Sequence, residues 1–190
     1  MATFYKGVGP GTFLYAQDFR LTGLAPHAPG SLSRISSLMS HITHGTTMSG
    51  YISLTKSYGV ARAYAFAGRI PPSATSPGFV YEIEINDPPP AGLTLVDPIC
   101  EIGSANVNPG LRHTYHHDGD QSLLLGIADP IGMAHHLGQM TIDPPNSGRT
   151  PRHPTISIEM EAMVRALRDA EVLVAGNIPT ICFVHRHDVY

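Results

Sequence analysis

Three short polar segments stand beside predicted β-strands, where side chains can be held firmly enough to do chemistry. They are Tyr5-Lys6 at the end of the first strand, Ser53-Leu54-Thr55 at a strand end, and Asp169-Ala170-Glu171 before a strand. An ammonium group binds anions, hydroxyls orient their neighbours by hydrogen bonding, and a carboxylate stabilises developing positive charge. Taken singly, each segment also fits a structural role, as surface charge, as β-prone hydrogen-bonded residues or as a solvated acidic edge.

Histidine is a second residue type that could do chemistry, because the chain contains 11 of them. Two groups stand out, His113-Thr114-Tyr115-His116-His117-Asp118 and His135-His136. Imidazoles this close to a carboxylate could ligate a transition metal, which leaves a metal-dependent hydrolase as a minor alternative. Their spacing matches no ligand pattern such as His-Glu-x-x-His, and the loop around them is flanked by glycine and proline. We therefore predict loop polarity and no metal site.

The overall composition predicts the kind of fold that must position these residues. Apolar residues make up 42% of the 190, which is enough for a core and excludes wholesale disorder. The 19 glycines and 17 prolines interrupt helices and therefore exclude a long helical bundle or a coiled coil. We predict one α+β domain over residues 1–190, with a loop-rich insert at about residues 90–155.

Charge and apolar patterning narrow the range of partners. The net charge of −3 at pH 7 provides no electrostatic footprint for nucleic acid or for an anionic membrane. No apolar run approaches the roughly 20 residues of a membrane span, and the first residues lack a signal-peptide pattern. The two cysteines, Cys100 and Cys182, are too few for a disulfide scaffold, and we expect both to be free thiols.

Hydrophobic periodicity predicts the elements around the polar segments. Apolar residues recur at helical spacing over residues 31–40 and 158–167, and Ser57 is a suitable N-cap for an alanine-rich helix over residues 58–67. Residues 102–119 and 143–155 read as loop, and Pro130 should break or kink a helix over residues 120–137. Strands are expected at residues 3–6, 51–55, 78–85, 93–96, 171–174 and 180–187.

The polar segments and their neighbours occur in an order that is typical of one group of enzymes. Phe4-Tyr5-Lys6 ends a strand, a helix leads to His41, and Tyr51-Ile52-Ser53-Leu54-Thr55-Lys56-Ser57 precedes an alanine-rich helix and a long strand. Asp169-Ala170-Glu171 then runs through a strand into Gly176-Asn177-Ile178-Pro179. In these motifs, over roughly residues 1–90 and 155–190, the chain resembles the mono-ADP-ribosyltransferase toxins and effectors of the cholera-toxin and pertussis-toxin type.

The resemblance implies a fold, a substrate and a set of site residues. The fold would be two small packed β-sheets with flanking helices, and the substrate would be NAD. Glu171 takes the position of the catalytic carboxylate at the NAD ribose, with Ser53 orienting it and Asp169 facing the acceptor. Lys6, His41 and Thr55, together with Ser53, take positions that bind NAD. Thr55 would either support the strand geometry or contact the nicotinamide side.

The resemblance also implies an activity, the transfer of ADP-ribose from NAD to a side chain of a host protein. The protein would be a secreted toxin or effector acting in the host-cell cytoplasm, and a host activator could assist it. Lys6 departs from the family, whose arginine meets phosphates through a planar, bidentate fork. The alternative is therefore a catalytically degenerate module that binds ligand or protein without transfer. Asp169, one methylene shorter than the family's glutamate, weakens the case for an arginine acceptor.

Overall fold

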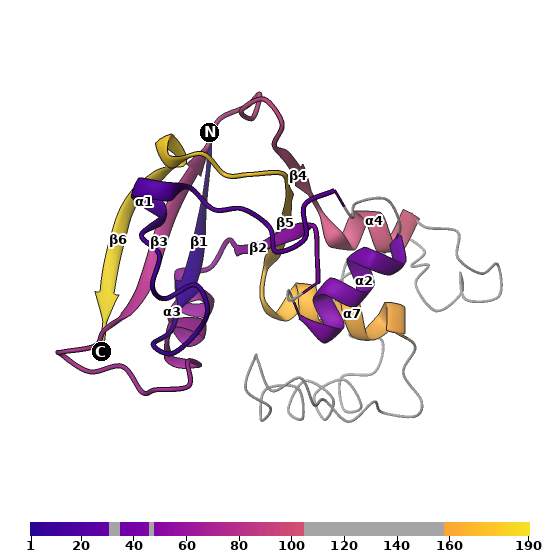
Figure 1. The fold of residues 1–190 in the computed structure, drawn as a ribbon. Coiled ribbons are helices and arrows are strands. Elements are labelled where there is room, and N and C mark those ends of the chain that lie inside the picture. The colour runs from indigo at the N-terminus through magenta and orange to yellow at the C-terminus, as the bar shows by residue number, and fades with distance from the viewer. Residues whose placement is uncertain (31–34, 46–47, 105–157) are drawn as a thin grey trace.

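Six antiparallel strands form the centre of the molecule. The computed structural model describes residues 1–30, 35–45, 48–104 and 158–190, and the loops and kinked helix predicted within residues 105–157 lie outside the described residues. The strands are hydrogen-bonded in the order β4-β5-β2-β1-β3-β6, so that segments far apart in the sequence lie side by side (Figure 1). Their bounds are Ala2–Val8 for β1, Tyr51–Thr55 for β2, Gly78–Ile85 for β3, Thr94–Val96 for β4, Glu171–Ala175 for β5 and Phe183–Val189 for β6.

Strand β3 has the bounds and the alternation that the sequence predicts. Tyr81, Ile83 and Ile85 are almost completely buried, whereas Glu82 and Glu84 between them are half-buried. Side chains alternate between the two faces of a strand, so this pattern shows that one face of β3 packs against the core. Because β3 lies between β1 and β6 and pairs with both along most of its length, it sets the register of this half of the sheet.

The two halves of the sheet join at one residue pair. Strand β1 meets β2 at Tyr5↔Thr55, whereas β2 pairs with β5 from Tyr51↔Ala175 to Thr55↔Glu171. The α+β class is confirmed. The resemblance implied two small packed β-sheets, whereas this pair links β4-β5-β2 to β1-β3-β6 in one hydrogen-bonded sheet. The link also brings Lys6 of β1 beside Ser53 of β2.

The main core contains alternate residues from both halves of the sheet. Burial of their apolar surface, at roughly 25 cal/mol per Å², is the main force that holds the two halves against the same cluster. The buried residues that the strands contribute are Phe4, Val8, Ile52, Leu54, Tyr81, Ile83, Ile85, Val172, Val174 and Phe183. Phe19 from the short helix α1 (Phe19–Thr22) completes the cluster with rings that contact Tyr81 and Phe183.

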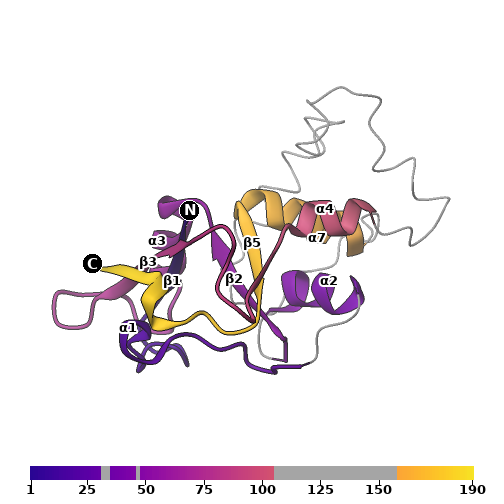
Figure 2. The same ribbon diagram turned by 90° about the horizontal axis from the view of Figure 1, so that it is seen from above.

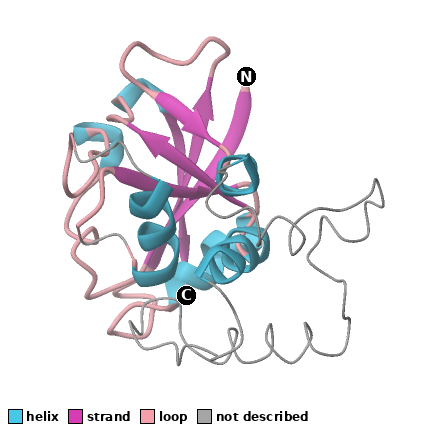
Figure 3. Cartoon of the chain, turned by 90° about the vertical axis from the view of Figure 1, so that its right-hand side faces the viewer, coloured by secondary structure: helices cyan, strands magenta, loops and turns pink. Residues whose placement is uncertain are grey.

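Among the described residues, three helices gather beside the β4-β5-β2 half of the sheet. They are α2 (Ile35–His44), α4 (Pro98–Ser104) and α7 (Ile158–Arg168), and Figure 2 shows them on one side of the molecule, away from β6. Figure 3 shows the strands of the sheet with helices packed beside them. Leu38 and Met39 of α2 pack with Leu173 of β5 in a second core cluster. Since Leu173 shares a face of β5 with Glu171, α2 covers the side of the sheet onto which Glu171 points.

Helix α3 (Tyr58–Phe66) packs on β1, on the opposite side from Lys6. The predicted N-cap is confirmed, because the Ser57 hydroxyl accepts a hydrogen bond from the Val60 amide. Gly7 permits close contact with this helix, since a Cβ at Gly7 would lie 1.9 Å from the carbonyl oxygen of Ala61. The packing therefore fixes the strand that carries Lys6.

Several predicted element bounds need correction. Helix α2 runs to His44, beyond the predicted end at residue 40, because buried side chains continue its apolar face and Gly45, with a φ of 94°, follows its last residue. Residues 102–104, predicted as loop, belong to α4, which starts at Pro98 after Asp97 accepts hydrogen bonds from two amides of its first turn. The last strand begins at Phe183, because Thr180–Cys182 form a 3-10 turn.

Candidate functional site

The pairing of β2 with β5 places three of the predicted site residues on one face of the sheet. Thr55 lies directly opposite Glu171, and Ser53 lies two residues further along the same face. The intervening Leu54 and Val172 turn into the main core, which leaves the polar side chains facing α2. The strand register thus brings together hydroxyl and carboxyl groups that are more than 110 residues apart in the chain.

Lys6 approaches these residues from β1. Its Nζ donates a hydrogen bond to the main-chain carbonyl of Ser53 over 3.0 Å. Burial lowers the pKa of Lys6 from 10.5 to about 8, because a buried ammonium group loses its hydration, and the nearby Glu171 carboxylate opposes this shift. Lys6 is therefore a cation at neutral pH that loses its charge in mildly alkaline solution.

Glu171 is a carboxyl group that titrates near neutral pH. Its pKa is raised from 4.5 to about 7, chiefly by burial. A hydrogen-bonding interaction with Ser53 and the charges of Lys6 and Arg168 favour the ionised form, whereas the charge of Asp169 disfavours it. Such a perturbed carboxyl group beside a cation is characteristic of functional sites and is also found in structural ion-pair networks.

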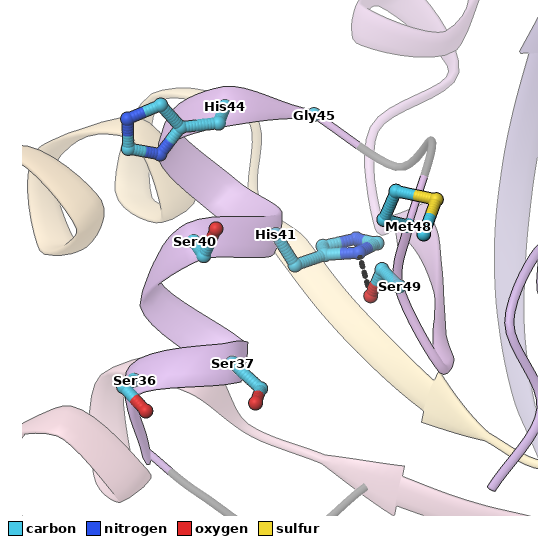
Figure 4. A pocket seen from close by; sticks show the side chains of 8 residues that line it. All are labelled: Ser36, Ser37, Ser40, His41, His44, Gly45, Met48 and Ser49. Carbon is cyan, nitrogen blue, oxygen red and sulfur yellow. Dashed lines mark hydrogen bonds between the residues drawn. The ribbon is translucent and has the colours of Figure 1, made fainter. Parts of the chain in front are cut away.

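His41 extends the cluster from helix α2. Its Nε2 lies 2.6 Å from the Ser53 hydroxyl oxygen, and its Nδ1 lies 2.6 Å from the hydroxyl oxygen of Ser49, the contact drawn in Figure 4. Burial, with a contribution from the charge of Lys6, lowers the pKa of His41 from 6.5 to about 3. The ring is therefore neutral at physiological pH and acts as a hydrogen-bonding bridge, not as a charge.

Asp169 has a different environment from the one that the sequence predicts. Arg168 donates from Nε to Oδ1 over 2.7 Å and from Nη2 to Oδ2 over 2.6 Å, and the Tyr64 hydroxyl donates to Oδ2 over 2.6 Å. Burial and the neighbouring Asp169 carboxylate both raise the pKa of Tyr64. The two oxygens of Asp169 are thus already engaged by side chains of this domain.

Thr55 holds the turn that leads into Glu171. Its hydroxyl donates to the carbonyl oxygen of Asp169 over 2.5 Å and accepts from the Ser57 amide over 3.0 Å. Ala170 has a φ of 45°, an uncommon conformation for a residue with a side chain, and its carbonyl accepts from the Lys56 amide. Thr55 is buried, so these contacts match the supporting role expected for it better than a direct contact with nicotinamide.

The structure thus brings together four of the six predicted residues. Lys6, His41, Ser53 and Glu171 form one cluster, while Thr55 and Asp169 belong to the turn beneath it. Reasoning from the sequence missed Ser49, Tyr64 and Arg168. The nearest signals were the Ser49-Gly50 pair before β2 and the Arg168-Asp169 neighbours, but Tyr64 lies on an alanine-rich helix and has no sequence signal.

A cavity of about 360 Å³ adjoins the cluster on the α2 side (Figure 4). Its walls combine serine hydroxyl and histidine imidazole groups with apolar surface, so it offers hydrogen-bonding groups and apolar contact to a ligand. It is lined by Ser36, Ser37, Ser40, His41, His44, Gly45, Met48 and Ser49. His41 and Ser49 belong both to this cavity and to the hydrogen-bonded cluster, which makes the two features continuous.

Comparison with known proteins gives no family for the chain. Neither a protein-family model nor a curated protein matches it. Within the described residues, no group of three or more histidine, cysteine or acidic side chains is arranged to hold a metal ion, and the histidine-rich segments lie outside those residues. None of the described helices is long and apolar enough to cross a bilayer. Cys100 and Cys182 are both free thiols, as predicted.

Proposed function

We propose that this protein is an NAD-dependent mono-ADP-ribosyltransferase. The observation that carries the proposal is the convergence of Lys6, His41, Ser53 and Glu171 from three strands and a helix. Transfer of ADP-ribose breaks the bond between nicotinamide and ribose and leaves positive charge on the sugar. A partly buried carboxylate stabilises that charge more strongly than one in water would, provided that it is ionised and firmly held.

Each residue of the cluster has a role in this proposal. Glu171 binds the ribose hydroxyl and stabilises the developing charge, while Ser53 orients its carboxylate. Lys6 meets the diphosphate as a point charge, and neutral His41 holds the Ser53 hydroxyl and contacts the adjoining ribose. Nicotinamide leaves as a neutral molecule with the bonding electrons, and a nucleophilic side chain of the acceptor forms the new bond to the ribose carbon and releases its proton to water.

The proposed biological setting is that of a secreted toxin or effector that modifies a host protein in the host-cell cytoplasm, with a host activator as a further partner. Arg168 and Tyr64 already bind the Asp169 carboxylate. Asp169 therefore holds the turn on the acceptor side of the site and does not bind the acceptor itself. This arrangement disfavours an acceptor whose recognition needs a carboxylate at Asp169, as a guanidinium does.

A catalytically degenerate module is the second candidate, and one contact favours it. The Nζ of Lys6 is hydrogen-bonded to the Ser53 carbonyl, so one of its three donors is committed within the protein. A module of this kind binds NAD without breaking its bond to nicotinamide. Calorimetry with NAD beside a nicotinamide-release assay separates the two, because the module binds and releases nothing.

The decisive variant is Glu171→Gln, which keeps the shape of the side chain and removes its charge. We expect nicotinamide release, and the modification of candidate host proteins seen by mass spectrometry, to fall by at least about 100-fold. Glu84→Gln on β3 is the matched control, because Glu84 is also a half-buried strand glutamate but lies outside the cluster. Modification that persists unchanged in Glu171→Gln rules out the assigned role of Glu171.

A further inference from the structure

Ser49 is held in place by its own main chain and by its neighbours. It is 7% exposed and stands two residues before Tyr51, the first residue of β2. The Ala28 amide donates to its carbonyl oxygen over 2.9 Å, and the Tyr51 amide donates to its hydroxyl oxygen over 3.1 Å. The hydroxyl oxygen therefore already accepts one hydrogen bond, and the hydroxyl proton is left to be donated.

The nearest acceptor for that proton is His41. A neutral imidazole has one nitrogen that donates and one that accepts, and Nδ1 lies 2.6 Å from the Ser49 hydroxyl oxygen. If Ser49 donates to Nδ1, the ring proton is on Nε2, which then donates to the Ser53 hydroxyl oxygen over 2.6 Å. Ser53 is in turn left with its own proton to donate to the Glu171 carboxylate.

The opposite direction satisfies these groups less well. With the proton on Nδ1, His41 would donate to a Ser49 oxygen that already accepts from Tyr51, and the Ser49 proton would lose its acceptor. Ser53 would then donate to Nε2 and present no proton to Glu171. The first direction gives the ring proton and both hydroxyl protons an acceptor, and a donor left without a partner is costly, so the first direction is favoured.

We propose that Ser49 is a positioning residue that fixes His41 in the tautomer with its proton on Nε2, and so directs the Ser53 hydroxyl to Glu171. This role rests on the proposed function in so far as Glu171 is the catalytic carboxylate. The tautomer itself follows from the geometry of Tyr51, Ser49 and His41 alone.

The charges around the cluster are unaffected by a change at Ser49, which is uncharged. Glu171 faces Lys6 from β1, Tyr64 from α3, Arg168 at the end of α7, and Asp169 in the turn that follows it. His41 faces Lys6 and the exposed His27. A change in the titration of Glu171 in a Ser49 variant must therefore travel through the hydrogen bonds.

The first test is nitrogen-15 NMR of the histidine rings in the full chain at pH 8, with His41→Gln used to assign the His41 signals. We expect a protonated, pyrrole-type Nε2 and an unprotonated, pyridine-type Nδ1 in the parent. Ser49→Ala should lose this preference, and Ser49→Thr, which keeps the hydroxyl, should retain it. A parent ring protonated on Nδ1, or a preference unchanged in Ser49→Ala, overturns the proposal. The parent spectrum decides the tautomer even if Ser49→Ala fails to fold.

The second test is the pH profile of nicotinamide release. Ser49→Ala should lower kcat roughly 2- to 10-fold, the equivalent of one net hydrogen bond, and move the acidic limb of the profile to higher pH with little change in KM. Ser49→Thr should restore both, and Ser73→Ala, which changes an exposed serine outside the cavity and the cluster, is the control. A normal profile in Ser49→Ala overturns the positioning role. Absence of nicotinamide release in the parent refutes the proposed function instead, and the NMR result then stands alone.

Discussion

Lys6 donates a hydrogen bond from Nζ to the main-chain carbonyl of Ser53 over 3.0 Å, across 47 residues of sequence. The contact lies beside the Tyr5↔Thr55 pair that joins the two halves of the sheet. It therefore places the single cation of β1 next to the strand that carries the Ser53 hydroxyl. Burial at this position lowers the pKa of Lys6 to about 8. The charge of Lys6 acts on Glu171, a carboxyl group whose pKa is about 7.

Nicotinamide release should have a bell-shaped dependence on pH. The active form needs ionised Glu171, so kcat/KM should rise roughly tenfold between pH 6 and pH 8 as Glu171 loses its proton near pH 7. Above pH 8, loss of the Lys6 charge should weaken NAD binding. Steady-state assays from pH 5 to pH 10 measure both limbs. A rate that does not change between pH 6 and pH 8 contradicts the role of Glu171.

Stability should also report on Glu171, independently of any activity. Its raised pKa means that the folded protein binds more protons than the unfolded chain between pH 4.5 and about 7, so the free energy of unfolding falls as pH rises through this window. Glu171→Gln removes this contribution. We therefore compare the free energy of unfolding of Glu171→Gln with that of the parent by urea unfolding. The difference should shift in favour of the variant by about 1–3 kcal/mol between pH 5 and pH 8. An equal difference at both pH values would show that Glu171 titrates normally.

Lys6→Arg should extend activity into alkaline solution. A guanidinium remains charged above pH 12 and adds donors for a diphosphate. Between pH 8 and pH 9 we expect the release rate of the parent to fall about fivefold, as a group of pKa about 8 loses its proton, and that of Lys6→Arg to fall less than about twofold. Lys6→Met, which has no charge, should be inactive throughout. An alkaline limb that stays in place in Lys6→Arg assigns that limb to another group.

Tyr64→Phe should loosen the turn that carries Asp169. The change removes the donor that lies 2.6 Å from Oδ2 of Asp169 but leaves the bidentate contact of Arg168. We expect the free energy of unfolding to fall by about 1–3 kcal/mol, the cost of a lost hydrogen bond to a charged group. Tyr58→Phe on the same helix is the control, because Tyr58 is 38% exposed, and it should change stability by less than about 0.5 kcal/mol. Equal effects of the two changes would argue against the Asp169 contact.

A pair of glycine substitutions tests the packing of α3 on β1. In Gly7→Ala the new Cβ would lie 1.9 Å from the carbonyl oxygen of Ala61, so we expect a loss of at least about 2 kcal/mol in unfolding free energy. In Gly59→Ala, within α3, the nearest atom is the Ser57 hydroxyl oxygen at 3.7 Å, and stability should rise by about 0.5–1 kcal/mol. Urea denaturation of both variants gives the comparison. A tolerated Gly7→Ala would mean that α3 lies further from β1.

The sequence by itself determined the local features of this protein. The alternation of Phe79, Tyr81, Ile83 and Ile85 predicted strand β3, and Ser57 predicted the start of α3, because both depend on residues that are close in the chain. The glycine and proline content excluded a helical bundle for a similarly local reason. The polar segments at strand ends could be recognised as candidates for the same reason, without knowledge of their neighbours in space.

Only the tertiary structure decided which of these polar residues act together. The register of β2 against β5 and the single link between β1 and β2 are long-range relationships, and a shift of one residue would turn Ser53 to the opposite face. Packing of α2 brought His41 between Ser49 and Ser53, and packing of α3 brought Tyr64 to Asp169. Asp169 was therefore engaged by its own domain, although its place in the sequence beside Glu171 predicted a catalytic role. Contacts of this kind depend on how the elements pack, and no local pattern encodes them.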